Sequence, residues 1–151
     1  MCGFCGFTSF NKGENLNNSI IQEMNNSLEH RGPDSASTWC DSNYEIYFGH
    51  RRLSIIDLSD CATQPFVSSN GRYVIAYNGE IYNFKTLKLE LNIDWKSTSD
   101  TEVLIEYISN YGLEKTLDKV EGMFAFALWD NKEKKLTLCR DRIGEKPLYY
   151  G

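Results

Sequence analysis

The chain has 151 residues, of which 41% are hydrophobic and 25% charged, with 16 basic and 21 acidic side chains. These proportions are typical of a soluble single-domain protein. The net charge of −5 argues against a nucleic-acid or acidic-membrane partner, because both need a basic surface. We see no apolar run of membrane-spanning length and no signal peptide, so we expect a cytoplasmic protein whose five cysteines stay reduced.

The first half of the chain is expected to contain short strands and one helix. A strand is predicted over 4–8, an amphipathic helix over 16–29, and a hairpin with strands over 38–40 and 44–49. A further strand is predicted over 72–77, bounded by Asn78-Gly79. On its own, Asn-Gly most often indicates a hairpin turn.

In the second half, a short helix over 83–91 would have Asn83 as its N-cap. Ser99-Asp100-Thr101-Glu102 has the spacing of a capping box and opens a helix that ends at Gly112. A helix over 113–119, strands over 123–129 and 135–140, and a strand beginning at 148–151 follow. Helices and strands are segregated rather than alternating, which favours an α+β fold with antiparallel sheets.

The start of the chain, Met1-Cys2-Gly3, carries the chemistry of greatest interest. Cys2 is small, so we expect Met1 to be removed, which would leave a thiol and a free α-amine on one residue. An α-amine titrates near pH 8 (roughly 7.7–8.0) and can take the thiol proton, so that one residue supplies both nucleophile and base. The alternatives are a small residue at the start of a strand, or a Cys-x-x-Cys redox or metal motif with Cys5.

Seven short blocks follow one another along the whole chain. They are Met1-Cys2-Gly3, His30-Arg31-Gly32-Pro33-Asp34-Ser35, Arg52-Leu53-Ser54-Ile55-Ile56-Asp57, Tyr77-Asn78-Gly79-Glu80-Ile81-Tyr82-Asn83, Ser99-Asp100-Thr101-Glu102, Gly122-Met123-Phe124-Ala125-Phe126-Ala127 and Arg140-Asp141-Arg142 with Gly144. In this order they resemble the glutaminase domain of class II glutamine amidotransferases, and most closely that of glutamine-hydrolysing asparagine synthetases. The resemblance implies a four-layer αββα sandwich of the N-terminal-nucleophile hydrolase type.

The resemblance also implies a reaction, the hydrolysis of L-glutamine to glutamate and ammonia. Cys2 would be the nucleophile that forms a γ-glutamyl thioester. The Asn78 side-chain amide and the Gly79 backbone N–H would form the oxyanion hole.

The substrate's amino-acid end would be bound by residues of three further blocks. Arg52 would bind the α-carboxylate in a bidentate manner, and Glu80 and Asp100 would recognise the α-ammonium group. The backbone around Leu53, Ser54, Ile55 and Ile56 would line the same pocket. As alternative roles, Arg52 would be a solvated surface residue and Asp100 a stabilising acid in the first turn of its helix.

Features that are missing shape the remaining expectations. No phosphate-binding loop is found, so we expect no cofactor and no metal in this chain, with ATP and Mg²⁺ bound only by a synthetase domain that lies elsewhere, normally on the same polypeptide. The family domain usually continues past the block that ends at Gly151, so we expect a domain truncated at its C-terminal end. A non-catalytic interaction module of the same fold is the alternative function.

Overall fold

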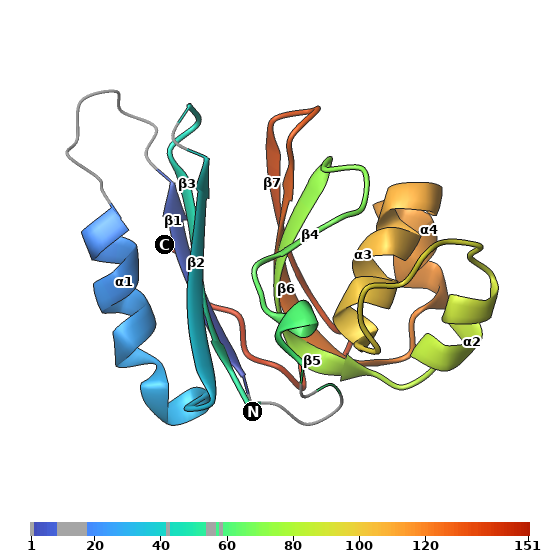
Figure 1. Ribbon diagram of the computed structural model, residues 1–151, viewed down its shortest axis with the longest axis horizontal. Helices are drawn as coiled ribbons and strands as arrows, with labels where there is room; N and C mark the ends of the chain where they lie inside the picture. Colours follow the sequence, from blue (N-terminus) through green and yellow to red (C-terminus); the bar gives the residue numbers. More distant parts are fainter. Residues whose placement is uncertain (1, 9–17, 42, 54–56, 58) are drawn as a thin grey trace.

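The computed structural model describes residues 2–8, 18–41, 43–53, 57 and 59–151. A first, three-stranded antiparallel sheet has the order β1-β3-β2. Its strands are β1 (Gly3–Thr8), β2 (Ser35–Asp41) and β3 (Ile46–Arg52). Helix α1 (Asn18–Ser27) covers the outer face of this sheet, followed by the 3-10 helix η1 (Glu29–Arg31) (Figure 1). Helix α1 therefore ends at Ser27, before the C-terminal end of the helix predicted over 16–29.

A second, four-stranded antiparallel sheet has the order β4-β5-β6-β7. Its strands are β4 (Phe66–Val67), β5 (Tyr73–Ile81), β6 (Gly122–Asp130) and β7 (Lys135–Arg140). The 3-10 helix η2 (Asp60–Ala62) precedes β4. Two helices, α3 (Asp100–Tyr111) and α4 (Leu113–Lys119), pack on the outer side of this sheet together with α2 (Phe84–Leu89) (Figure 1).

Two sequence predictions about strands are wrong, namely the end of the strand predicted over 72–77 and the strand beginning at 148–151. Asn78-Gly79 is not a turn, because β5 continues through it and pairs with β6, with Asn78 opposite Ala125 and Gly79 opposite Phe124. A complete partner strand thus overrides the local turn preference of Asn-Gly. Residues 148–151 form no strand, since a strand needs a hydrogen-bonded neighbour.

The helix-start signals are partly correct. The Ser99 hydroxyl accepts a hydrogen bond from the Glu102 N–H at 3.2 Å, as the capping box predicts. However, the Glu102 carboxylate accepts from the N–H groups of Lys96 and Ser97 instead of turning back to Ser99. Asn83 makes no capping bond, and its side chain bonds the Lys119 carbonyl and the Glu121 N–H beyond α4.

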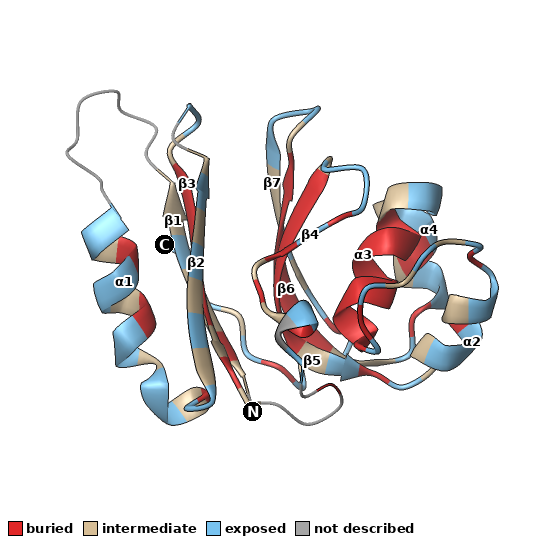
Figure 2. Cartoon of the chain, in the orientation of Figure 1, coloured by how far each residue is buried: buried red, intermediate tan, exposed pale blue. Residues whose placement is uncertain are grey.

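The layers are helix, sheet, sheet, helix, and the side-chain alternation of the strands produces two separate cores (Figures 1 and 2). Alternate residues of β5 and β6 pack against the helices: Tyr73, Ile75, Tyr77, Phe124, Phe126 and Leu128. The residues between them pack against the first sheet: Val74, Ala76, Ala127 and Trp129, with Ile46 and Phe48 of β3. This arrangement confirms the predicted α+β sandwich. In the described part of the chain, no helix is long and apolar enough to cross a membrane.

Candidate active site

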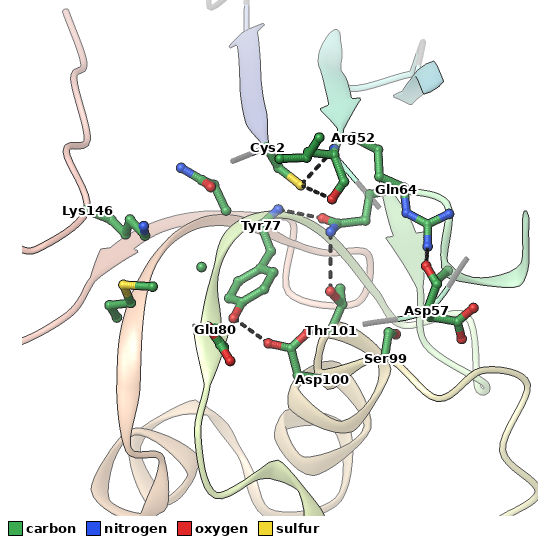
Figure 3. A pocket seen from close by; sticks show the side chains of 15 residues that line it. Cys2, Arg52, Asp57, Gln64, Tyr77, Glu80, Ser99, Asp100, Thr101 and Lys146 are labelled. Carbon is green, nitrogen blue, oxygen red and sulfur yellow. Dashed lines mark hydrogen bonds between the residues drawn. The ribbon is translucent and has the colours of Figure 1, made fainter. Parts of the chain in front are cut away.

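A cavity of about 140 Å³ opens where the ends of β1, β3 and β5 meet the start of α3 (Figure 3). Seven residues singled out in the sequence line it: Cys2, Arg52, Leu53, Asn78, Gly79, Glu80 and Asp100. The other three, Ser54, Ile55 and Ile56, lie outside the described residues. These seven residues come from four of the seven sequence blocks, and Met123 of a fifth block lines the same cavity.

Cys2 directly precedes β1 and lies half-buried beside the backbone of Leu53. The Leu53 N–H donates to the Cys2 Sγ at 3.4 Å, and the thiol lies 3.7 Å from the Leu53 carbonyl oxygen (Figure 3). These two contacts with Leu53 hold the thiol at the wall of the cavity.

Cys5 lies on the opposite face of the first sheet. A side chain built at Gly49 would meet both the Cys5 Sγ and the Asn25 side chain of α1, so Cys5 faces the helix while Cys2 faces the cavity. Burial raises the pKa of the Cys5 thiol to about 11. The two thiols therefore lack the shared face that a redox pair or a metal site requires, and Cys5 is a poor nucleophile.

Asn78 and Gly79 lie in the interior of β5 at the cavity wall. Asn78 follows Val74 and Ala76 on the face that meets the first sheet, and it is only 7% exposed. Phe124, opposite Gly79, bonds Asp141 through both its N–H and its carbonyl. Because opposite residues of an antiparallel pair share either both ladder bonds or neither, the Gly79 N–H points away from β6, toward the open edge of β5.

Arg52 ends β3 and is 8% exposed. Its guanidinium donates to the carbonyl of Ser59 at 2.7 Å and to that of Asp57. A guanidinium has five N–H donors, so further donors remain for a carboxylate ligand. This is not the solvated surface arginine that was the alternative interpretation.

Asp57 organises the loop that Arg52 contacts. One carboxylate oxygen accepts from the Ser59 N–H and hydroxyl, and the other accepts from the Thr98 N–H at 2.7 Å. These hydrogen bonds, first that of the Ser59 hydroxyl, hold the pKa of Asp57 well below its usual range. The sequence analysis assigned Asp57 no role, although it closes the block that begins at Arg52.

Asp100 is the first residue of α3 and lies buried at the inner end of the cavity. Its carboxylate accepts from the Tyr77 hydroxyl at 2.8 Å and from the Ile81 N–H at 2.9 Å. Burial raises the pKa of Asp100. Burial and the charge of Asp100 likewise raise the pKa of Tyr77 well above its usual range. Glu80, by contrast, is exposed at the rim.

The cavity is lined by the guanidinium of Arg52 and by the carboxylates of Glu80 and Asp100. These opposite charges suit a zwitterionic ligand. Three further polar lining residues were missed by the sequence analysis: Gln64, Thr101 and Lys146. Thr101 lies within a recognised block, and Lys146 lies shortly after the block that includes Gly144. Gln64 lies between blocks, and its only signal was the proline that follows it.

Two facing antiparallel sheets between helical layers, with a cysteine directly before the first strand, form a fold of the N-terminal-nucleophile hydrolase type. The family model described as "Glutamine amidotransferase domain" matches residues 1–151, and the chain belongs to this family. A solved structure of glutamine phosphoribosylpyrophosphate amidotransferase from B. subtilis superposes with a TM-score of 0.67 at 23% identity, over 82% of this chain and 34% of that one. This likeness supports the fold.

Relatives of similar sequence include glutamine-hydrolysing asparagine synthetases. Asparagine synthetase 3 of Bacillus subtilis is 37% identical over 99% of this chain and 25% of its own length. Asparagine synthetase 1 of the same organism is 41% identical over 99% of this chain and 24% of its own. Amidase chry2 of Gibberella zeae is 37% identical over 99% of this chain and 24% of its own length. The chain thus spans about a quarter of the length of these curated relatives.

Proposed function

We propose that this chain hydrolyses L-glutamine to glutamate and ammonia, with Cys2 as the nucleophile. The observation that carries the proposal is the cavity, where the Cys2 thiol, Asn78, Gly79, Arg52 and Asp100 line one space. The domain family and the asparagine synthetases among the relatives support the same reaction.

In the first step, the Cys2 sulfur attacks the side-chain amide carbon of glutamine, and a γ-glutamyl thioester forms as the C–N bond breaks. The thiol proton passes through the α-amine of Cys2 to the leaving nitrogen, which departs as ammonia. Water then attacks the thioester, giving glutamate and regenerating the thiol. The α-amine can act as this base only after Met1 has been removed, since an amide nitrogen is not basic.

The developing negative charge on the substrate oxygen is stabilised by the Asn78 side-chain amide and the Gly79 N–H. The alternation along β5 directs that N–H to the open edge of the strand, which supports this role. Donors already fixed in place stabilise the transition state without reorganising during the reaction.

The α-carboxylate of glutamine binds Arg52, and the α-ammonium group binds Asp100, with Glu80 at the rim and the backbone around Leu53 completing the pocket. Binding of an ammonium group favours the charged form of Asp100, against the effect of its burial. The substrate amino acid thus supplies the counter-charge that this buried carboxylate needs.

We further propose that the released ammonia passes to an acceptor domain of the asparagine-synthetase type, on the same polypeptide. ATP and Mg²⁺ would bind to that domain, where the acceptor carboxylate is activated. The chain matches about a quarter of the length of the asparagine synthetases. This supports the proposal that glutamine hydrolysis and acceptor activation belong to different domains.

The test combines glutaminase assay with thiol labelling, on protein whose intact mass shows that Met1 has been removed. Cys2→Ala should abolish glutamate release while circular dichroism stays unchanged, and the control Cys5→Ala should retain turnover. A glutamine-mimicking electrophile should label Cys2 alone. A folded, processed protein without turnover would instead favour the non-catalytic interaction module, and labelling chiefly at Cys5 would favour thiol redox chemistry.

Processing provides a second test. Protein that retains Met1, or carries a tag ahead of Cys2, should lose most of its turnover because the amide nitrogen of Cys2 cannot take a proton. Normal turnover by a tagged, unprocessed protein would contradict the use of the α-amine as base.

A further inference from the structure

Among the residues that the structure describes, no strand pairs with the edge of β5 beside the cavity. The short β4 pairs with β5 only through Phe66 opposite Ile75 and Val67 opposite Val74. Continued in the same register, β4 would place Gln64 opposite Tyr77. The pairing stops before that point. The backbone groups of Tyr77 on this edge therefore need other partners.

Two buried side chains replace the missing strand. The Tyr77 N–H donates to the Gln64 Oε1 at 2.7 Å (Figure 3). The Tyr77 carbonyl accepts from the His50 Nε2 at 3.0 Å, across the interface between the two sheets. A carbonyl can only accept, so the Nε2 of His50 carries the proton in this contact. Gln64 is 5% exposed and His50 is 1% exposed, so water does not compete for either bond.

The Tyr77 carbonyl belongs to the peptide group that leads directly into Asn78. Gln64 holds the Ala76–Tyr77 peptide through the Tyr77 N–H, and His50 holds the Tyr77–Asn78 peptide through the Tyr77 carbonyl. Together the two bonds fix the peptide planes on both sides of Tyr77, and with them the direction of the Asn78 side chain and of the Gly79 N–H. The Gln64 Nε2 also donates to the Thr101 hydroxyl at 3.2 Å. Gln64 therefore ties the start of α3, where Asp100 lies, to the same point of β5.

We propose that Gln64 and His50 are positioning residues for glutamine hydrolysis, which hold the two peptide groups on either side of Tyr77 so that Asn78 and Gly79 face the reacting carbonyl. This inference rests on the proposed function. It assigns both residues an effect on the transition state and not on substrate affinity alone, because displaced oxyanion donors lower kcat.

The test uses Gln64→Met, which keeps the length of the side chain but removes both hydrogen bonds, and His50→Leu, which removes the donor. His50→Gln retains an N–H at a similar reach and should rescue most of the activity. Ser68→Ala is the matched control, because the Ser68 hydroxyl also accepts from an N–H of β5, that of Tyr73 at 2.9 Å, but far from Asn78 along the strand.

Turnover is expressed per site labelled by the glutamine-mimicking electrophile, so that misfolded protein does not count. Gln64→Met and His50→Leu should each lower kcat on the order of 10- to 100-fold, since a misplacement of about 1 Å costs roughly 100-fold, while KM changes little. Ser68→Ala should keep the wild-type kcat per labelled site. A wild-type kcat per site in both Gln64→Met and His50→Leu would overturn the inference, as would an equal loss in His50→Gln and His50→Leu.

Amide hydrogen exchange supplies a readout that does not depend on activity. The Tyr77 amide should be protected in the wild-type protein and should exchange faster in Gln64→Met than in Ser68→Ala. Unchanged protection in Gln64→Met would overturn the claim that Gln64 holds this peptide. If the wild-type protein released no glutamate at all, the proposed function would fall, whereas the exchange of Tyr77 would still decide whether the peptide is held.

Discussion

Replacing Gly79 with Ala tests how closely β5 and β6 must approach beside the cavity. A Cβ built at Gly79 would lie 2.3 Å from the Met123 carbonyl oxygen and 2.7 Å from the Phe124 Cα. Real Cβ contacts are essentially never below 3.0 Å, so the strands would have to separate locally by about 0.7 Å, the difference between 2.3 and 3.0 Å. Both obstructing atoms belong to backbone and cannot rotate away.

Overpacking of this kind typically costs about 1–3 kcal/mol of folding free energy. The same displacement would move the proposed oxyanion donors, so Gly79→Ala should also lower kcat by roughly 10- to 100-fold. Urea unfolding followed by circular dichroism measures the first effect, and glutamate release per labelled site measures the second.

Gly71→Ala is the matched control for this substitution. Gly71 has a φ of +71° with nothing within 4 Å of a built Cβ, so alanine there should cost about 1 kcal/mol of backbone strain and leave kcat unchanged. If Gly79→Ala showed the wild-type unfolding midpoint and the wild-type turnover, the argument from close strand approach would be refuted.

Three further predictions concern the loop, the substrate and pH. Asp57→Asn removes an acceptor from the Thr98 N–H and should raise KM for glutamine several-fold by loosening the loop that contacts Arg52; an unchanged KM would contradict this. In steady-state kinetics, Arg52→Lys should mainly raise KM and Asn78→Ala mainly lower kcat, and the reverse pattern would exchange their roles. Burial lowers the pKa of His50 from 6.5 to about 4, so the unfolded chain binds the extra proton and stability should fall as pH drops from 6.5 to 4. His50→Gln should flatten that part of the urea-midpoint profile, and an equally steep profile in the variant would assign the loss to other groups.

Much of the fold followed from the sequence because local signals and tertiary packing agreed. The helix over 113–119 was predicted with the bounds that the structure has, since Gly112 and an apolar face mark it locally. The strand β5 was predicted too short, because its second half contains Asn78-Gly79, a pair whose local preference is a turn. Only the partner strand β6, distant in sequence, makes that segment extended.

The seven described site residues with motif signals line one cavity, whereas Gln64 and Asp57 were missed for different reasons. Gln64 acts through hydrogen bonds to backbone and hydroxyl groups of distant segments, and no local pattern encodes such contacts. Asp57 stood inside a recognised block, but its bonds to Ser59 and Thr98 depend on a loop geometry that spacing alone does not define.

The two cores of the sandwich have a consequence for cooperative unfolding. One core lies between the sheets and the other between the second sheet and its helices, so the two form separate packing units. The cavity draws on all of these layers except α1, with Arg52 from the first sheet and Asp100 from the start of α3. A bound amino acid that contacts both Arg52 and Asp100 would link the two cores. Ligand binding should therefore make the two cores unfold together and should raise the midpoint of thermal unfolding.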